Sequence, residues 1–287
     1  MSGKENIMEH RISISSIEDF RVKLIEEERS LATIDKYMRD IRFFFQWLGK
    51  ENVVEKEKVI AYKNELVQKY AMASVNSILA ALNSFFKGMG WYDCVVRSVK
   101  VQREAFRTKE QELTKAEYYR LLNAAREKGN TRLYHIMQTI CSTGIRVSEL
   151  QFITVESLQT KRATVHLKGK TRTILLTPQL CRELNRYVKE NHLKTGSIFI
   201  TRNGKPVDRT NILHDMKALC EKAQVSRQKV FPHNLRHLFA CTYYQLEKDI
   251  THLADLLGHS NINTTRIYTL VSCEEQEKQI EMLGLVL

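Results

Sequence analysis

The sequence has few residues that interrupt helices or cross-link a chain. Its 287 residues include 3 prolines and 11 glycines, which favours long helical segments. Its 6 cysteines are scattered without a CxxC pair, a pattern typical of reduced thiols in the cytoplasm. No run reaches the ~18–20 apolar residues of a membrane span, and the N-terminal MSGKENIMEHRISISS lacks the apolar block of a signal peptide. We therefore expect a cytoplasmic protein rich in helices, with no membrane partner.

Several catalytic signatures are also missing. There is no GxSxG nucleophile motif and no GxxxxGK[ST] phosphate loop, so a serine hydrolase and an ATPase are not favoured. His233 and His237 have the spacing of a helical metal-ligand pair. The zinc hydrolase pattern places Glu directly after the first His, where this chain has Asn234. A metal hydrolase is the weakest alternative, and we expect neither metal nor cofactor.

Positive charge, in contrast, is abundant. Lys and Arg number 45 against 33 Asp and Glu, a net charge of +12, while 43% of the residues are hydrophobic. That hydrophobic content suffices for a packed interior. The excess charge indicates a polyanionic partner, nucleic acid before membrane.

The pattern of apolar residues divides the chain in two. Over residues 14–95, segments such as TIDKYMRDIRFFFQWL and SVNSILAALNSFFKGMGW repeat apolar residues at helical spacing, which predicts about four helices in a small bundle. Residues 96–112 are charged, show little periodicity and are interpreted as a linker. Residues 113–287 are predicted to form a mixed, mainly helical domain that ends in an acidic, apolar tail.

Local signals define elements of the second part. Residues 114–117 form a capping-box pattern that starts a helix. LYHIMQTICSTGIRVSELQFI predicts a helix, a turn at Gly144 and a second helix. ATVHLKGKTRTILLT predicts a β-hairpin around Gly169, and residues 197–201 predict one short strand. The fold class is therefore mainly α with a small β-hairpin or sheet.

Cations and hydrogen-bond donors recur in four places. These are Arg146 in STGIRVSEL, the lysines of HLKGKTR, His233 and Arg236 in PHNLRH, and His259 with Tyr268 in LLGHSNINTTRIYT. Such a set suits a phosphate undergoing transfer, because fixed guanidinium groups stabilise the negative charge of the transition state.

The last of these stretches holds the candidate nucleophile. A tyrosine has a pKa near 10 and is a weak nucleophile at neutral pH, so we expect the surrounding cations to favour the phenolate of Tyr268. We also expect Gly258 to end one helix and Ser260 to cap the next.

The order of these boxes resembles the tyrosine recombinase family, which comprises phage-type integrases and Xer-like recombinases, over nearly the whole chain. STGIRVSEL is similar to the family's first arginine box, HNLRH to its HxxR box, and LLGHSNINTTRIYT to its last box. The N-terminal helices resemble its SAM-like core-binding domain. The family lysine lies on the hairpin, where Lys168 precedes the glycine; Lys170 is the alternative.

The resemblance implies a mechanism. Tyr268 attacks a DNA phosphodiester, forms a 3′-phosphotyrosyl link and releases a 5′-hydroxyl, without ATP or metal. Arg146 and Arg236 hold the non-bridging oxygens, and His259 adds a donor. Lys168 protonates the leaving 5′ oxygen. His233, the histidine of the HxxR box, helps proton transfer at Tyr268.

The resemblance also implies partners. A homo-tetramer would hold two double-stranded recombination sites and exchange strands through a four-way junction; accessory proteins are possible partners. The C-terminal tail would dock on the neighbouring subunit and regulate it. Basic residues expected to contact DNA phosphates are Lys36, Arg39, Lys170, Arg172, Arg202 and Arg209.

Two other functions use part of the same evidence. A type IB topoisomerase shares the tyrosine chemistry but relaxes a single duplex. A non-catalytic DNA-binding accessory protein would share the basic surface but has no need of Tyr268. The complete set of boxes favours a recombinase that acts in the cytoplasm, on the nucleoid.

Overall fold

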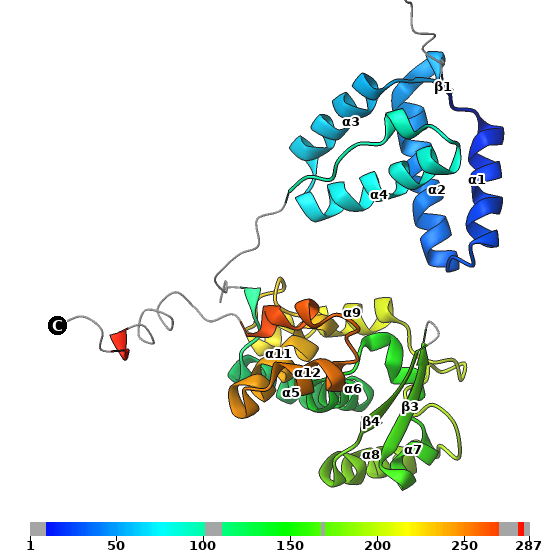
Figure 1. Ribbon diagram of the computed structural model, residues 1–287. Helices are drawn as coiled ribbons and strands as arrows, with labels where there is room; N and C mark the ends of the chain where they lie inside the picture. The colour runs from blue at the N-terminus through cyan, green and yellow to red at the C-terminus, as the bar shows by residue number, and fades with distance from the viewer. Residues whose placement is uncertain (1–9, 101–110, 168–169, 270–280, 284–287) are drawn as a thin grey trace, which may run out of the picture. The chain divides into compact units, whose positions relative to one another are not determined.

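The computed structural model describes residues 10–100, 111–167, 170–269 and 281–283. The chain divides into two compact units, Met1–Arg103 and Glu104–Leu287, which are described separately (Figure 1). Among the described residues, none of the helices has the length and apolar character needed to cross a lipid bilayer.

The N-terminal unit is the helical bundle that the apolar spacing predicts. Its helices are α1 (Ile14–Glu26), α2 (Leu31–Leu48), α3 (Lys56–Lys69) and α4 (Met72–Gly88). The side chains of Ser13 and Ser30 accept backbone N–H groups at the starts of α1 and α2, which satisfies donors that a helix leaves unpaired. Two short strands, β1 (His10–Arg11) and β2 (Val53–Val54), pair antiparallel; at two residues each, they are too short to show in the sequence pattern.

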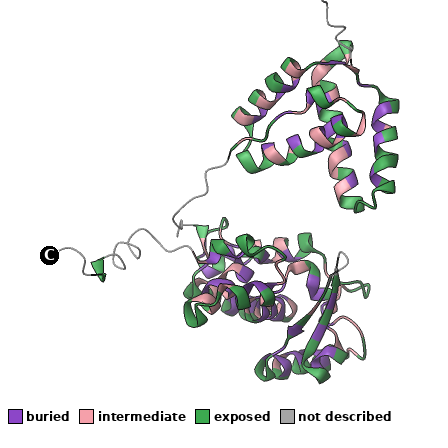
Figure 2. Cartoon of the chain, in the orientation of Figure 1, coloured by how far each residue is buried: buried purple, intermediate pink, exposed green. Residues whose placement is uncertain are grey.

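Aromatic side chains fill the core of this bundle. Phe44 is fully buried, and its ring centroid lies 5.1 Å from that of Tyr62, 5.9 Å from Phe86 and 6.1 Å from Trp47. Buried and exposed positions alternate along the helices (Figure 2). Part of the segment interpreted as a linker also packs here, because the backbone N–H of Val96 donates to Asn83 and Val96 is buried.

The second unit is mixed, as expected. Its elements are α5 (Lys115–Glu127), α6 (Thr131–Thr143), α7 (Val155–Thr160), β3 (Arg162–Leu167), β4 (Lys170–Leu175), α8 (Pro178–Glu190), α9 (Arg209–Lys217), α10 (Cys220–Ala223), α11 (Pro232–Glu247) and α12 (Ile250–Leu257). Thr114 and Glu117 form the expected capping box at the start of α5. β3 and β4 form the expected antiparallel hairpin.

One sequence-based expectation for this unit is wrong, and another is refined. Residues 197–201 do not form a strand; Ser197 and Ile200 make only isolated bridges, to Thr154 and Pro206. The second helix expected after Gly144 is present, and it is a 3₁₀ helix, Val147–Phe152. Its six residues are too few for apolar spacing to distinguish the two kinds of helix.

A shared core positions the site. α11 lies beside α6, and residues from both, such as Ile140 and Leu235, are fully buried in one hydrophobic cluster. α12 and the 3₁₀ turn Arg266–Tyr268 pack against α11 through a smaller cluster that includes Cys241, Leu253 and Tyr268. The three boxes of the sequence therefore meet at one end of α6 and α11.

Candidate functional site

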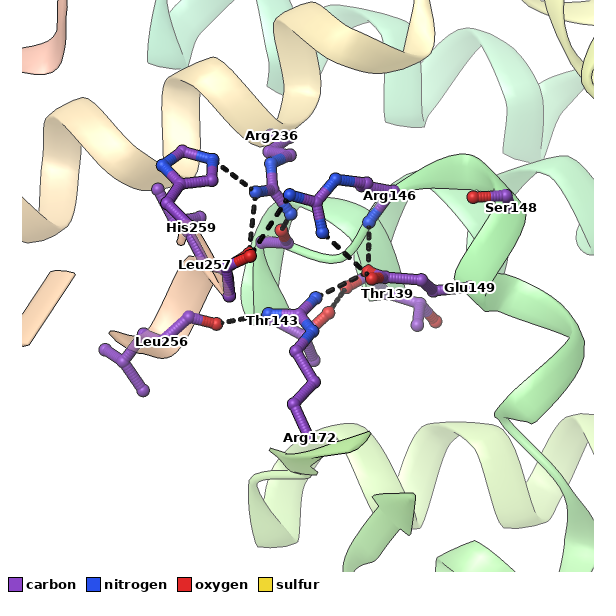
Figure 3. A network of polar contacts seen from close by, with 12 residues as sticks. Thr139, Thr143, Arg146, Ser148, Glu149, Arg172, Arg236, Leu256, Leu257 and His259 are labelled. Carbon is purple, nitrogen blue, oxygen red and sulfur yellow. Dashed lines mark hydrogen bonds and ion pairs between the residues drawn. The ribbon is translucent and has the colours of Figure 1, made fainter. Parts of the chain in front are cut away.

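Two arginines from separate segments, Arg146 and Arg172, meet at one buried carboxylate, and Arg236 lies beside them (Figure 3). Glu149 is 2% exposed. Its Oε1 accepts from Nη1 of Arg146 at 3.1 Å, and its Oε2 accepts from the backbone N–H of Arg146 at 2.7 Å. Arg172, on β4, donates to the same Oε2. The buried negative charge fixes two guanidinium groups in place and offsets part of their mutual repulsion.

The ends of two helices supply further acceptors. α6 and α12 end before Gly144 and Gly258, and the last carbonyl groups of a helix lack partners within it and carry the negative end of its dipole. The arginines bind these carbonyl groups: Arg236 donates to Gly144 and, at 2.8 Å, to Leu257; Arg172 donates to Leu256; Arg146 donates to Gly258 at 3.4 Å.

Both helix ends require glycine. Gly144 and Gly258 have φ of +65° and +63°, in the left-handed region that side chains rarely adopt. A Cβ at Gly144 would lie 2.4 Å from a ring carbon of Phe239, and one at Gly258 would lie 2.6 Å from Cδ of Arg172. The glycine of the STGIR motif thus lets the Phe239 ring approach the backbone, and the glycine of the LGH motif lets Arg172 do so. The expected helix end at Gly258 is confirmed.

A cavity of about 560 Å³ opens on this cluster, lined by Arg146, Arg209, His233 and Arg236 among others. Arg236 is 2% exposed, whereas 41% of the Arg146 side chain is exposed. The pKa of His233 is lowered, first by desolvation and then by the positive charges of Arg236, Arg146 and Arg209. The cavity therefore offers fixed cations and a neutral imidazole, an arrangement suited to a phosphate group.

Tyr268 is buried beside this cluster, with 3% exposed. Its ring stacks at 6.3 Å from that of His259 and meets the edge of His237 at 5.0 Å. Burial raises the pKa of Tyr268, although the charges of Arg236 and Arg146 act to lower it. The cations therefore act towards the phenolate as expected, but in the free protein desolvation outweighs them and the pKa of Tyr268 is raised.

His259 joins Arg236 to the loop that carries Tyr268. Its Nε2 lies 2.8 Å from Nη2 of Arg236, and its Nδ1 lies 2.8 Å from Oγ1 of Thr265. Desolvation, followed by the charges of Arg236 and its neighbouring arginines, lowers the pKa of His259 to about 4. His259 is therefore neutral at pH 7. The next helical turn is capped by Asn261 rather than by Ser260 as expected.

The residues expected to contact DNA differ in how free they are. Arg202 and Arg209 are exposed, and Arg209 lies at the cavity. Lys36 binds the buried Asp40 at 2.6 Å, whereas Arg39 is 62% exposed. Arg172 is held at Glu149. Lys168 lies outside the described residues, and of Lys170 only the backbone, in β4, is described.

Two residues of this site were missed by sequence reasoning. Glu149 stands three positions after Arg146 in the same box, which is the spacing of a helical ion pair and could have indicated it. The spacing of His237 suggests only a metal ligand, yet its ring contacts Tyr268, and its Nε2 lies 3.6 Å from the carboxylate of Glu112. Neither burial nor ring contact is visible in the spacing alone.

One group of potential metal ligands occurs among the described residues, in the other unit. Ligand atoms of His10, Asp93 and Cys94 lie within 4.8 Å of one another. However, Nε2 of His10 bonds the carboxylate of Asp93 at 2.9 Å, and the buried thiol of Cys94 donates to the carbonyl of Val54. Because these ligand atoms bond to other protein groups, we interpret the three residues as a polar cluster of the bundle rather than as a metal site.

Comparison with known proteins shows the family of the chain. The model of the phage integrase family matches residues 111–275, and that of the N-terminal SAM-like domain of phage integrases matches residues 17–91. The chain belongs to the phage integrase family. Among its relatives, this family member is 29% identical to tyrosine recombinase XerA of Thermococcus kodakarensis over 280 residues, covering 94% of this chain and 95% of that one. It is 28% identical to tyrosine recombinase XerD of Lacticaseibacillus casei, covering 89% and 94%.

Solved structures share the fold of this integrase-family chain. XerH bound to its difH substrate matches with a TM-score of 0.69 at 20% identity, covering 94% of this chain and 84% of that one. A lambda integrase dimer bound to a COC′ core site matches with a TM-score of 0.72 at 18% identity, covering 88% and 94%. The expected family and fold class are confirmed, and the relatives favour a site-specific tyrosine recombinase over a topoisomerase or a non-catalytic accessory protein.

Proposed function

We propose that this chain cuts and rejoins double-stranded DNA at specific sites, with Tyr268 as the nucleophile. Tyr268 attacks a phosphodiester, forms a 3′-phosphotyrosyl link and releases a 5′-hydroxyl. One observation carries the proposal: Arg146, Arg236 and His233 line a single cavity, and Tyr268 packs beside it against His259. The link preserves the phosphodiester's bond energy, so the step uses neither ATP nor metal.

The two arginines have the chemistry to bind the scissile phosphate. Guanidinium groups donate two parallel hydrogen bonds to phosphate oxygens, and donors held in advance stabilise the transition state without reorganisation. Glu149 and the carbonyl groups that end α6 and α12 hold Arg146 and Arg236 in this way. Loss of one such donor costs ~3–4 kcal/mol in comparable sites.

Proton transfer falls to the remaining candidates. The raised pKa of Tyr268 keeps its phenol protonated at pH 7, so attack needs a proton acceptor. The lowered pKa of His233 keeps its imidazole neutral, the form that accepts a proton. We propose that His233 helps this transfer and that Lys168 protonates the leaving 5′ oxygen.

The lysine assignment has its own test. A substrate with sulfur in place of the bridging 5′ oxygen has a leaving group that departs without protonation. Lys168→Ala should therefore fail on the normal duplex and cleave the sulfur-containing one, with Lys170→Ala as the matched control. Normal cleavage of the oxygen substrate by Lys168→Ala would show that the assignment is wrong.

The nucleophile is tested by trapping. The protein is incubated with a library of nicked duplexes, in which the released strand diffuses away, and the covalently bound DNA is sequenced. We expect a defined site linked to Tyr268 and no linked DNA with Tyr268→Phe. DNA trapped on the Tyr268→Phe variant would overturn the assignment.

We further propose that four copies assemble on two DNA sites and exchange strands through a four-way junction. This complex forms on the nucleoid in the cytoplasm, and accessory proteins, where used, join it. A solved lambda integrase relative is described as a tetramer bound to a Holliday junction.

In this chain, an apolar groove of about 410 Å³ between α5, α6 and α11 exposes Tyr119 and Leu246. We propose that the C-terminal tail of a neighbouring copy docks there. A chain that ends at Cys273 should bind one site but form fewer tetramers by analytical ultracentrifugation; an unchanged tetramer would count against tail docking.

The expected phosphate contacts are Lys36, Arg39, Lys170, Arg172, Arg202 and Arg209. Arg209 is the sharpest of these, because it is exposed at the cavity. Arg209→Ala should weaken DNA binding and reduce the slope of log affinity against log salt by about 1. An unchanged slope would remove Arg209 from the interface.

A further inference from the structure

Thr265 connects the two candidate residues of the last box. It is fully buried, while its neighbour Thr264 is exposed. Its hydroxyl lies 2.8 Å from Nδ1 of His259, and its carbonyl accepts the backbone N–H of Tyr268 at 2.9 Å. Thr265 therefore contacts the His259 ring and the Tyr268 backbone from one buried position.

The contacts of His259 define which of its nitrogens carries the proton. A guanidinium group only donates hydrogen bonds, so Nε2 of His259, 2.8 Å from Nη2 of Arg236, must be the acceptor. Because the ring is neutral at pH 7, its single proton is then on Nδ1. The hydroxyl of Thr265 accepts that N–H.

A phosphate in the cavity demands the opposite arrangement. The non-bridging oxygens of a phosphodiester only accept hydrogen bonds, so a contact from Nε2 of His259 requires a proton on Nε2. The charged and titratable groups that face His259 are Arg236 and His233 on α11, Arg146 after α6, and Arg172 on β4, all of which disfavour a positive imidazole. The neutral ring must therefore carry its proton on Nε2 instead of Nδ1, and Nδ1 becomes an acceptor.

We propose that Thr265 is a positioning residue that holds His259 in the Nδ1–H form in the free protein and supports its Nε2–H form when phosphate occupies the cavity. A hydroxyl can serve both forms, because it accepts from Nδ1–H in the first and rotates to donate to Nδ1 in the second. Water takes the proton from Nδ1 and supplies one to Nε2, so the ring stays neutral. The phosphate-bound half of the proposal rests on the proposed function; the free-state half does not.

The proton positions can be observed directly. Full-length protein with ¹⁵N-labelled histidine, in long-range ¹H–¹⁵N correlation spectra, distinguishes the two forms of His259. We expect Nδ1–H in the free protein and Nε2–H on titration with dimethyl phosphate, a phosphodiester whose oxygens only accept hydrogen bonds. A proton on Nε2 in the free protein, or one that stays on Nδ1 at saturating dimethyl phosphate, overturns the proposal. This measurement needs no DNA cleavage, so it fails or succeeds independently of trapping on Tyr268.

The rate at which the covalent complex forms on a nicked duplex gives a second readout. Thr265→Val removes the hydroxyl and keeps the shape, and should slow covalent-complex formation about 10- to 100-fold, the effect of leaving a buried polar group unpaired. Thr265→Ser should restore the rate to within about threefold. Thr264→Val, on the exposed neighbour, should leave it unchanged.

The pH dependence separates positioning from a merely structural role. A protonated His259 has N–H on both nitrogens and needs no exchange, so the deficit of Thr265→Val should narrow as pH falls from 6 towards 4, the pKa of His259. A ratio of variant to unmodified rates that is constant over this range would show that the hydroxyl only supports the fold. Equal rates for Thr265→Val and the unmodified protein would exclude any role.

Discussion

The two units bury different kinds of side chain. In the described part of the N-terminal unit, Ser16 and Asp40 are the buried polar residues, and the partners of Asp40 reach it from the surface. The second unit buries more polar side chains, among them Glu149, Arg236 and Thr265 in the network of the candidate site. An apolar core needs only matching shapes, whereas a buried polar cluster is stable only when each member has a partner.

This difference can be measured, because the units carry separate optical signals. The chain has 2 tryptophans, Trp47 and Trp91, and both lie in the N-terminal unit. Their fluorescence reports the unfolding of that unit, while far-ultraviolet circular dichroism follows the helices of both. Each variant below is therefore unfolded in urea with both signals recorded.

The largest effect is expected from Glu149→Gln. The change removes the buried charge between Arg146 and Arg172, and breaking a buried ion pair costs about 3–5 kcal/mol. We expect the dichroism transition to shift and the fluorescence transition to stay, with trapping on DNA slowed about 100-fold. A shift in both signals would show that the units unfold together.

The reverse case is Phe44→Ala, in the apolar core of the first unit. Removal of a fully buried ring costs about 3–5 kcal/mol, through lost contacts and the cavity left behind. The fluorescence transition should move to lower urea. The pKa of His259, followed by NMR, should be unaffected; a changed pKa would mean that the bundle supports the site.

Acid should weaken the second unit selectively. The folded-state pKa of His259 is lowered from 6.5 to about 4, so the unfolded chain binds protons more readily. The contribution of the neutral His259 to folding stability is therefore fully present above pH 6.5 and is lost as pH falls towards 4. His135 and His233, also with lowered pKa, act in the same direction. His259→Gln should flatten the pH dependence of the dichroism midpoint; an unchanged dependence would assign the acid sensitivity to the other histidines.

The smallest effect is expected from a surface pair of the N-terminal unit. Arg42 and Glu18 are in contact at 3.0 Å, but their side chains are 57% and 47% exposed. Glu18→Gln should change the free energy of unfolding by less than about 1 kcal/mol in the fluorescence transition. A loss as large as that of Glu149→Gln would contradict the view that burial, rather than charge pairing, separates the two units.

The sequence predicts repeated patterns better than single contacts. Long helices such as α2 and the β3–β4 hairpin follow from apolar spacing, which extends over many residues. The 3₁₀ segment Val147–Phe152 and the bridges of residues 197–201 are too short to carry such a signal. In the site, motif spacing indicates Arg146, Arg236 and His259 as neighbours. It shows neither the burial that raises the pKa of Tyr268 nor the contact of Thr265 with His259, because both depend on how distant segments pack.

The burial of Tyr268 has a consequence for the cell. With 3% exposed and a protonated phenol, the proposed nucleophile is not presented to DNA that merely diffuses past the free protein. On the proposed function, the amount of free protein in a cell is then not a measure of its amount of reactive tyrosine, because the packing of Arg266–Tyr268 against His259 covers the nucleophile.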